Sequence, residues 1–331
     1  MKLSIIIVNW NSKKLLSQCL ASIEAFPPSC EFEVVVWDNN SSDDSMIKAR
    51  ESHPWAKFVA SSDNLGFGGG NNGADKHCTG EFLLFLNPDT EVHQNSLDKA
   101  LAFVSGERGS TEIGVVGVNQ EDVDGELTGA CGHFASLPVL LLQNVQVILV
   151  GLGLVAAAKW LSRVLGRPMM PLKNLVPLFS FDRVMKVDWV LGAFMLVRRD
   201  IAHRAGMFDT DFFLYGEEVD FCKRVYDLGY SNYYLGDVKI THVGGGTTQS
   251  ISAKSEAAHW VGAIKYYQKH NGAVQTSIYR LLLLGIHSLK VVRCYLKNSD
   301  KERKMAARMS LNAVVWPRYD LIFGQGLRKS G

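Results

Sequence analysis

The chain has 331 residues, of which 47% are hydrophobic and 21% charged; this excludes a disordered or collagen-like protein and allows one large α/β domain or two average ones. Its six cysteines are scattered, with no Cys-x-x-Cys pair or zinc-spaced Cys/His cluster, so neither a disulfide scaffold nor a structural zinc site is expected. The net charge of the chain is only +2, but it is unevenly distributed. The segment from Arg280 onward contains 11 Lys/Arg and 3 Asp/Glu, a net charge of +8, and the residues before it have a net charge of −6. This basic carboxyl-terminal region points to an anionic surface, either nucleic acid or phospholipid head groups.

The amino terminus predicts a strand and a helix and no export signal. The apolar segment 3–8 is too short for a signal-peptide core and lacks a small-residue cleavage site. The segment ends at Asn9, and apolar residues recur at helical spacing over 15–23. We therefore expect a cytosolic protein that begins with a buried parallel strand followed by a helix.

Two further segments repeat this pattern. Residues 33–37 and 82–86 are apolar or β-branched runs, and each ends at a polar cluster, the first at Asp38 and the second at Asn87. Strands that alternate with helices predict a doubly wound α/β sheet that collects its polar groups at the carboxyl edge, where ligands bind. Later elements are predicted as a strand over 187–197, a loop and amphipathic helix over 209–230, and a strand over 231–241.

An uncharged apolar segment separates the two halves of the chain. Residues 134–158 carry no charge, and Lys159, Arg163 and Arg167 follow at four-residue spacing. The segment fits an interfacial membrane element, a buried core helix or a membrane-spanning helix. Residues 276–297 repeat the order of an apolar part followed by a basic face, and two such elements favour lipid over nucleic acid as the anionic partner.

Two polar motifs in the first half fit a nucleotide ligand. Asp38 is either a helix cap or an acceptor for a nucleobase imide or a ribose hydroxyl. Residues 64–73 hold five glycines, which allow close approach of a backbone to a ligand, and a helix that begins near Asn72 would aim free amides at an anion. The alternative is a flexible surface loop, and the lysine loop of phosphate-binding ATPases is not matched.

Three acidic or basic motifs fit catalysis. Asp89, which follows Asn87-Pro88, is either part of a turn or a ligand for a hard cation such as Mg²⁺ or Mn²⁺. The acids of 216–220 are either a helix amino terminus favoured by the helix dipole or a source of a general base. His242, at the end of a predicted strand, is either structural or a further ligand beside Asp89.

Taken together, these motifs resemble glycosyltransferase family 2 and, within it, the bacterial rhamnosyltransferase-like members. The resemblance covers residues 3–248 and implies the GT-A nucleotide-diphospho-sugar fold, an α/β structure with a mixed, mostly parallel central sheet flanked by helices. The motifs that carry it are Ile5–Asn11, Asp38–Asp43, Asn64–Gly73, Leu86–Asp89, Gly192-Ala193, Phe213–Asp220 and His242.

The resemblance also implies roles for single residues. Asp38 is expected to bind the nucleotide base, Asn64 and the Gly-rich segment to lie beside ribose and diphosphate, and Asp89 with His242 to hold Mg²⁺ or Mn²⁺. Glu218 is the expected catalytic base, although Glu217-Glu218 replaces the family's Glu-Asp pair and leaves Glu217 and Asp220 as alternatives; Asn87 replaces the first acid of the Asp-x-Asp motif. The remaining residues expected to bind substrate are Asn9, Asn11, Asn40, Gly68, Gly69, Asn72, Asn87, Gly192 and Ala193.

The function implied is that of an inverting, metal-dependent glycosyltransferase. It would move a sugar to a hydroxyl of a polyprenyl-diphosphate-linked saccharide in bacterial cell-surface polysaccharide synthesis. Rhamnose from dTDP-rhamnose is the first expectation for the donor. It would act as a peripheral protein on the cytoplasmic face of the inner membrane, without a nucleic-acid partner. The expected domains are a catalytic domain over 1–272, with a donor half (1–120), an apolar-basic insertion (134–170) and an acceptor half (185–250), and a membrane-associating helical region over 273–331.

Two alternatives remain at the level of sequence. A sugar-1-phosphate nucleotidyltransferase shares a similar sheet, but its Gly-rich opening followed by a basic residue is missing after the first strand. A non-catalytic membrane-surface scaffold that keeps a sugar-nucleotide pocket is the other, and the presence of Asp38, Asp89 and Glu218 argues against it. The Gln-x-x-Arg-Trp sequence of processive synthases is absent, which favours the addition of one sugar per visit.

Overall fold

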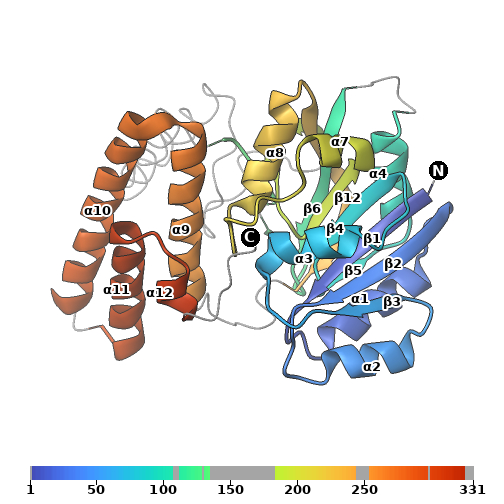
Figure 1. Ribbon diagram of the computed structural model, residues 1–331, viewed down its shortest axis with the longest axis horizontal. Coiled ribbons are helices and arrows are strands. Elements are labelled where there is room, and N and C mark those ends of the chain that lie inside the picture. The colour runs from blue at the N-terminus through green and yellow to red at the C-terminus, as the bar shows by residue number, and fades with distance from the viewer. Residues whose placement is uncertain are drawn as a thin grey trace.

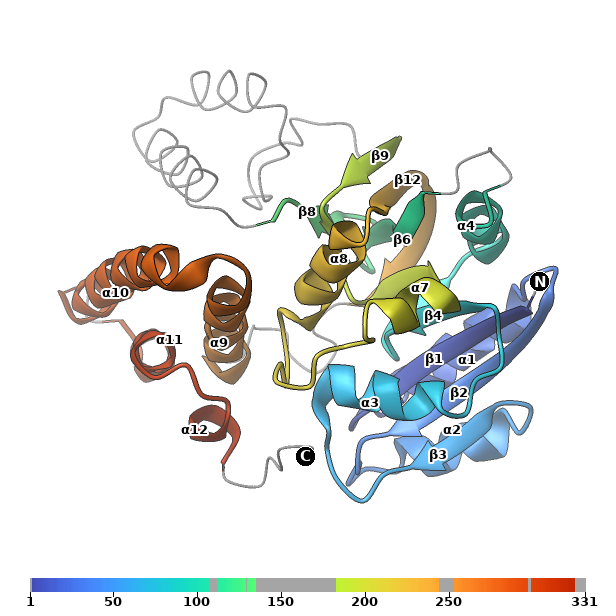
Figure 2. The same cartoon turned by 45° about the horizontal axis from the view of Figure 1, so that its top comes forward.

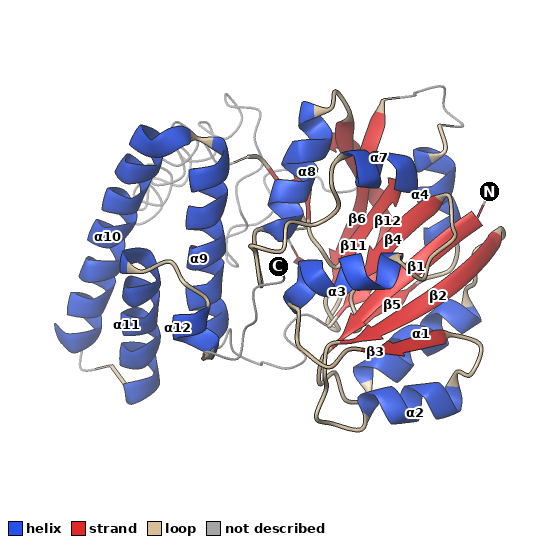
Figure 3. Cartoon of the chain, viewed as in Figure 1, coloured by secondary structure: helices blue, strands red, loops and turns tan. Residues whose placement is uncertain are grey.

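The structure is a computed structural model that describes residues 2–106, 112–128, 130–134, 183–243, 253–296 and 299–324 (Figure 1). Within these residues, a ten-stranded mixed sheet carries helices on both faces, and a separate group of helices lies beside it (Figure 3). Residues 135–170 of the predicted insertion lie outside the described residues.

The sheet has a parallel half and a mixed half. Its order is β3-β2-β1-β4-β11-β6-β12-β5, in which β3, β2, β1 and β4 are parallel and β11 runs antiparallel to both of its neighbours. Strand β7 pairs with β6, β9 pairs with β12, and β8 and β10 form a small second sheet. The strands are β1 (Lys2–Asn9), β2 (Glu31–Asp38), β3 (Lys57–Ala60), β4 (Phe82–Leu86), β5 (Thr90–Val92), β6 (Ile113–Glu121), β7 (Leu127–Thr128), β8 (Cys131–Gly132), β9 (Val184–Val187), β10 (Trp189–Val190), β11 (Phe194–Arg198) and β12 (Ser231–His242).

Alternating residues of the apolar strands bury their side chains on opposite faces of the sheet. On β1, Ile5 and Ile7 pack in one core with helices α1, α2 and α4, whereas Ile6 packs in the other with α3, α7 and α8. Both faces are therefore dry, which explains why these strands read as continuous apolar runs. The helices are α1 (Leu15–Ala25), α2 (Ser45–Ser52), α3 (Gly66–Asp75), α4 (Ser96–Val104), α7 (Arg199–Arg204) and α8 (Glu217–Asp227).

The prediction of one continuous strand over 187–197 is wrong. Trp189–Val190 leave the large sheet to pair with β8, a turn follows at Gly192-Ala193, and only Phe194–Arg198 enters the sheet as β11. The predicted strand over 82–86 is confirmed residue for residue, and the strand over 231–241 is confirmed as β12. The helix predicted within 209–230 is confirmed as α8.

The Gly-rich segment is helix α3, so the prediction that a helix begins near Asn72 is wrong. The glycines lie where α3 touches its neighbours: a Cβ at Gly70 would lie 2.7 Å from Val8 Cγ1, and one at Gly73 would lie 2.6 Å from Trp37 Cη2. Close approach of the helix to β1 and β2 therefore explains these glycines.

Gly73→Ala is expected to lower the free energy of unfolding by about 1–3 kcal/mol, because the methyl group has to displace the Trp37 ring. Urea denaturation followed by circular dichroism measures this. The matched control is Gly285→Ala in a helix where a Cβ would meet nothing within 4 Å; there we expect an unchanged or higher stability, since alanine favours a helix. A Gly73→Ala variant as stable as the wild type would contradict the packing described.

The carboxyl-terminal helices form a helical unit, which we define as residues 253–324. Aromatic side chains build its interior, including Tyr267 and Tyr279, whose rings stack with centroids 4.1 Å apart. The unit stands at the side of the sheet that carries α8 (Figure 2). No helix within the described ranges is both long and apolar enough to cross a membrane. Its helices are α9 (Ala253–His270), α10 (Gly272–Leu296), α11 (Lys301–Val315) and α12 (Asp320–Phe323).

The predicted division at residue 272 falls between α9 and α10. Helix α9 packs on α10 and α11 through Ile264 and Val261. Helix α9 therefore packs as part of the same helical unit as the helices that follow it. The predicted domain boundaries stay a prediction.

Candidate active site

Asp38 is held in a fixed orientation at the carboxyl end of β2. Its Oδ1 accepts hydrogen bonds from Asn9 Nδ2 at 2.7 Å and from Ser41 Oγ at 2.6 Å, and its Oδ2 accepts one from the Ser41 amide at 3.0 Å. Asn9 is fully buried and also donates to Ser45 Oγ. The role of Asn9 that the geometry supports is therefore to orient Asp38.

Asn11 and Asn40 shape the loops around Asp38. Both have positive φ, at 50° and 60°. The Asn11 Oδ1 accepts hydrogen bonds from the amides of Ser42 and Asp43, which ties the loop after β1 to the loop after β2. Asn40 is exposed beside them, so of these two predicted residues it is the more accessible to a ligand.

The first amides of α3 are bonded within the protein. Asn64 Oδ1 accepts the Gly66 N–H at 2.9 Å, and the Phe213 carbonyl accepts the Phe67 N–H at 3.2 Å. At the other end, Asn72 exchanges two hydrogen bonds with the backbone of Phe208. Helix α3 is thereby fastened to the 208–213 loop that leads toward the acids.

The predicted substrate residues Gly68 and Gly69 are buried against protein. A Cβ at Gly68 would meet Phe208, and one at Gly69 would meet Leu65. The geometry supports helix packing as their role, and their contact with substrate stays a prediction.

Asp89 and His242 come together although they lie far apart in sequence. The antiparallel pairing of β5 with β12 sets His242 opposite Thr90, next to Asp89. Asp89 Oδ1 lies 3.3 Å from His242 Nε2, and His242 Nδ1 lies 2.9 Å from Gln120 Oε1. Because that oxygen only accepts hydrogen bonds, Nδ1 carries the proton and Nε2 faces the carboxylate.

This arrangement fits a divalent cation. Two ligands at about 2.1 Å from one octahedral cation lie about 3 Å apart, close to the observed Oδ1–Nε2 separation. A neutral imidazole lone pair and a carboxylate repel each other unless a proton or a cation lies between them, and the Gln120 contact fixes the tautomer in the way typical of metal-bound histidine. Within the described ranges, no group of three or more His, Cys, Asp or Glu residues is placed to hold a metal.

The acids of 216–220 begin α8. Tyr215 and Gly216 both have positive φ, at 68° and 95°, and this sharp turn starts the helix. Glu218 Oε2 accepts the Gly216 N–H at 3.0 Å, while Glu217 Oε2 is buried without a hydrogen-bond partner. The helix dipole favours carboxylates here, but the burial of both makes their ionisation costly.

The two glutamates titrate as a pair with raised pKa values. Burial raises the pKa of Glu217 well above its ordinary value, and the neighbouring charge of Glu218 raises it further. Burial also raises the pKa of Glu218, although backbone N–H groups hold it lower. The hydrogen bond from the Gly216 N–H favours the ionised form of Glu218, whereas Glu217 Oε2 has no partner, so the geometry favours Glu218 as the ionised member of the pair.

Asp220 differs from the glutamates because it is surrounded by cations. Burial alone would raise its pKa, but His270, Arg224 and Lys269 together lower it to about 2. The carboxylate lies 2.7 Å from His270 Nε2 and 2.8 Å from Lys269 Nζ. These contacts join α8 to the end of α9, so the role of Asp220 that the geometry supports is the packing of the helical unit, and a role in proton transfer stays a prediction.

Contacts across the sheet edge bring the separate motifs together. The Asn87 amide donates to the Ala193 carbonyl at 3.1 Å, and a Cβ at Gly192 would lie 3.8 Å from Glu218 Cβ. Burial raises the pKa of the Tyr215 hydroxyl, and the carboxylates of Glu217, Glu218 and Asp89 raise it further. Glu217, Glu218 and Asp89 are therefore all close enough to Tyr215 to act on its hydroxyl.

Sequence reasoning missed the residues that brace the acidic turn. The Tyr319 hydroxyl donates to the Tyr215 carbonyl at 3.3 Å, and a Cβ at Gly262 would overlap the same carbonyl. Phe213, in the same loop, contacts Phe323 of α12 with ring centroids 5.4 Å apart. The bracing residues Gly262, Tyr319 and Phe323 lie in the carboxyl-terminal region and belong to no sequence motif.

Residues 4–129 match the family model described as glycosyl transferase family 2. The chain is a glycosyltransferase with a family 2 domain. The predicted enzyme class is thereby confirmed, and the polar residues that follow β1, β2 and β4 in this glycosyltransferase lie inside the matched range.

Two relatives extend over most of this glycosyltransferase. The N-acetylglucosaminyl-diphospho-decaprenol L-rhamnosyltransferase of Mycobacterium tuberculosis is 23% identical to it and covers 91% of this chain, with 96% of that protein aligned. The rhamnosyltransferase WbbL of Escherichia coli K12 is 22% identical over 79% of this chain and 91% of that protein. The similarity to the rhamnosyltransferase-like branch therefore reaches beyond the family 2 domain.

Solved structures support the same fold. The mannosyltransferase PcManGT from Pyrobaculum calidifontis, in complex with GDP-Man and Mn²⁺, superimposes with a TM-score of 0.55 at 15% identity, covering 96% of this chain and 87% of that one. GalNAc-T7 with UDP, GalNAc and Mn²⁺ gives a TM-score of 0.51 at 15% identity over 81% of this chain and 50% of that one. The predicted α/β fold of the GT-A type is confirmed.

Proposed function

We propose that this glycosyltransferase transfers a sugar, with rhamnose from dTDP-rhamnose as the leading donor, to a hydroxyl of a polyprenyl-diphosphate-linked saccharide, with inversion at the anomeric carbon. The observation that carries the proposal is that the carboxylates of Glu218 and of Asp89, which lies 3.3 Å from His242, both act on the Tyr215 hydroxyl. The donor and the lipid-linked acceptor are supported by the name of the Mycobacterium tuberculosis relative, which is similar over nearly the full length of both chains.

Asp38 and the loops around it would hold the nucleotide. With Asn9 and Ser41 fixing its orientation, the carboxylate can accept hydrogen bonds from a base imide or a ribose hydroxyl without reorganising. Asn64 lies at the start of α3, where its side chain also shapes the backbone that would border the ribose and diphosphate.

Asp89 and His242 would hold Mg²⁺ or Mn²⁺, which supplies positive charge beside the diphosphate leaving group. Glu218 would accept the proton of the acceptor hydroxyl as its oxygen attacks the anomeric carbon. A carboxyl with a raised pKa is a stronger base once ionised, and the protonated Glu217 beside it avoids placing two charges together.

The proposed place of action is the cytoplasmic face of the inner membrane, where the protein would bind peripherally in cell-surface polysaccharide synthesis. The support is the decaprenol-linked substrate in the name of the Mycobacterium tuberculosis relative. The alternative of a sugar-1-phosphate nucleotidyltransferase is not favoured by the family match or by either relative.

The test is the release of nucleoside diphosphate from a panel of dTDP-, UDP- and GDP-sugars by the purified protein, with and without divalent metal and bacterial lipid extract. We expect dTDP-rhamnose to be consumed only when both metal and lipid are present. Consumption of another donor would replace rhamnose, and the absence of turnover with every donor, although one binds, would favour the scaffold alternative.

A further inference from the structure

Helix α10 carries a second apolar face that points away from the helical unit. Its inner face buries Tyr279, Leu283 and His287 against α9 and α11. On the outer side, nine large apolar residues expose at least 38% of their surface: Val274, Ile278, Leu281, Leu282, Ile286, Leu289, Val292, Tyr295 and Leu296. We call these nine residues the α10 apolar face.

The α10 apolar face is a continuous stripe. Six of the nine, at positions 274, 278, 281, 289, 292 and 296, lie along one side of the helix at intervals of three or four once Gly285 between them is counted, and Leu282, Ile286 and Tyr295 flank this row. At about 1.5 Å per residue, the stripe from Val274 to Leu296 runs about 33 Å. Scattered single hydrophobic residues are normal on a surface, but a stripe of this length marks a site of interaction.

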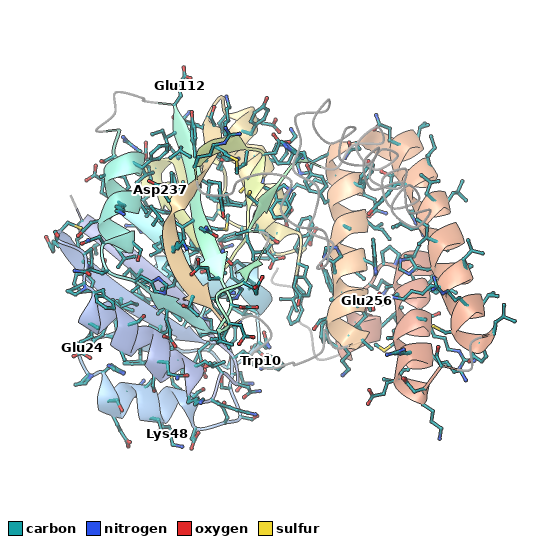
Figure 4. All side chains as sticks on the ribbon, turned by 180° about the vertical axis from the view of Figure 1, so that it is seen from behind. Trp10, Glu24, Lys48, Glu112, Asp237 and Glu256 are labelled. Atoms are coloured by element: carbon teal, nitrogen blue, oxygen red, sulfur yellow. The ribbon has the colours of Figure 1, made fainter. Side chains whose placement is uncertain are left out.

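Helix α10 itself carries no acid, and cations border the stripe. Residues 272–296 contain no Asp or Glu, and exposed Arg293 lies near the carboxyl end of the helix. Lys304 Nζ and the Arg308 guanidinium of α11 both lie over the ring of Tyr295, at 5.3 and 5.2 Å from its centroid. Lys290 is not part of this group, because it pairs with Glu256. Glu256 lies on α9, as Figure 4 shows.

We propose that the α10 apolar face docks in the plane of an anionic phospholipid bilayer, with Arg293, Lys304 and Arg308 against the head-group phosphates. The inference deepens the proposed function and rests on it for the need to reach a membrane-embedded acceptor. An apolar stripe bordered by cations and free of acids matches the chemistry of an interfacial helix. The helical unit also braces the acidic turn through Tyr319, so a docked α10 and Glu218 belong to one connected framework.

The first experiment measures flotation of the full-length protein with vesicles of phosphatidylethanolamine and phosphatidylglycerol, without any donor. We expect the wild type to bind, and Leu281→Asp with Leu289→Asp to bind at least roughly tenfold more weakly, since these two side chains are 69% and 71% exposed. The matched control is Ile47→Asp on α2, which is 63% exposed but lies on the other side of the molecule (Figure 1). It should bind like the wild type.

The charges are tested separately. Arg293→Gln with Arg308→Gln should weaken binding to vesicles that contain phosphatidylglycerol and leave binding to pure phosphatidylcholine vesicles unchanged, and high salt should reproduce that loss. Circular dichroism checks that the variants fold; should the aspartates disturb α10, Leu281→Gln with Leu289→Gln gives a milder test of the same face.

Three outcomes would overturn the docking proposal. The first is failure of the wild type to float with any vesicle, and the second is flotation of the Leu281/Leu289 variant like the wild type. The third is a wild-type dimer that this variant converts to a monomer, which would assign the face to a second copy. Transfer to a short-chain, water-soluble acceptor separates docking from catalysis: the variant should keep it. If the wild type binds vesicles but consumes no donor, the proposed function is contradicted and the docking proposal is still supported.

Discussion

Replacing Glu218 by glutamine is expected to lower turnover by about 10²–10⁴-fold, the usual contribution of a general base, while binding of the nucleotide-sugar is kept. Glutamine preserves the shape of the side chain and can still accept the Gly216 N–H bond at its carbonyl oxygen. The proton of the acceptor hydroxyl, however, loses its acceptor. Steady-state kinetics measure kcat, and calorimetric titration with the nucleoside diphosphate measures binding.

The pH profile of the wild type should also identify Glu218 as the general base. Burial raises the pKa of Glu218 from its ordinary value of 4.5. Because the base acts only when ionised, kcat/KM should rise with pH along an acid limb whose midpoint lies above 4.5, and Glu218→Gln should lose that limb. A wild-type limb that persists in the variant would assign it to another group.

Two neighbours serve as comparisons for Glu218. Glu217→Gln removes a carboxyl that stays protonated, so it should retain most of the turnover; if it shows the larger loss, the base is Glu217. Asp227→Asn, at the far end of the same helix and partly exposed beside Lys223, should behave like the wild type.

The paired glutamates also affect stability. A carboxyl whose pKa is higher in the folded state than in the unfolded state contributes stability below its unfolded pKa and loses it as the pH rises through the folded value. Burial raises the pKa of both Glu217 and Glu218, so Glu218→Gln should match the wild type in stability under acid conditions and exceed it at alkaline pH. Loss of activity in this variant is therefore not expected to reflect unfolding.

The parallel half of the fold could be predicted from sequence because burial on both faces leaves a clear mark. Strand β4 and residues 5–8 of β1 are uninterrupted apolar runs that are followed by Asn87 and Asn9. Because the two strands pair in parallel, the polar residues that follow them meet at one sheet edge. The turn at Gly192-Ala193 could not be predicted in this way. The strand pattern runs through it, and only pairing with β8 draws Trp189–Val190 out of the large sheet.

The Gly-rich segment shows how one residue type can answer two demands. Glycines permit a backbone to approach a ligand, and they equally permit a helix to lie close to a sheet. Trp37 and Gly73 are far apart in the sequence, so their contact could not be predicted before the fold was known. The same holds for Tyr319 and Tyr215, which are 104 residues apart and carry no motif that links them.

Asp89 and His242 are even farther apart in sequence, by 153 residues (242 − 89), yet their proximity was predicted. Each follows or ends a strand at the same sheet edge, and the resemblance to glycosyltransferase family 2 named both. The pairing of β5 with β12 supplies the physical reason, because it sets His242 opposite Thr90. Gln120, which orients the imidazole from β6, was not predicted, since a glutamine inside an apolar strand gives no sign of its partner.

Asp89→Ala is expected to lower turnover by at least about 100-fold and to remove the dependence on divalent metal, because positive charge beside the leaving diphosphate contributes several kcal/mol to such a reaction. The fold should survive: the bond that ties this position to β12 runs from the Val243 N–H to the backbone carbonyl of Asp89, which alanine keeps. Turnover against metal concentration, together with Mn²⁺ binding followed by electron paramagnetic resonance, measures both effects.

The neighbouring acid Glu91 provides the control for Asp89. It lies on β5 opposite Thr241, one position along the same pairing, so Glu91→Ala removes an equal charge from the same strand without touching His242. We expect this variant to keep its metal dependence and most of its turnover. If the two variants lose activity alike, general electrostatics of the strand would explain the loss; if Asp89→Ala keeps full activity, the cation binds elsewhere and the 3.3 Å approach of Asp89 to His242 is structural.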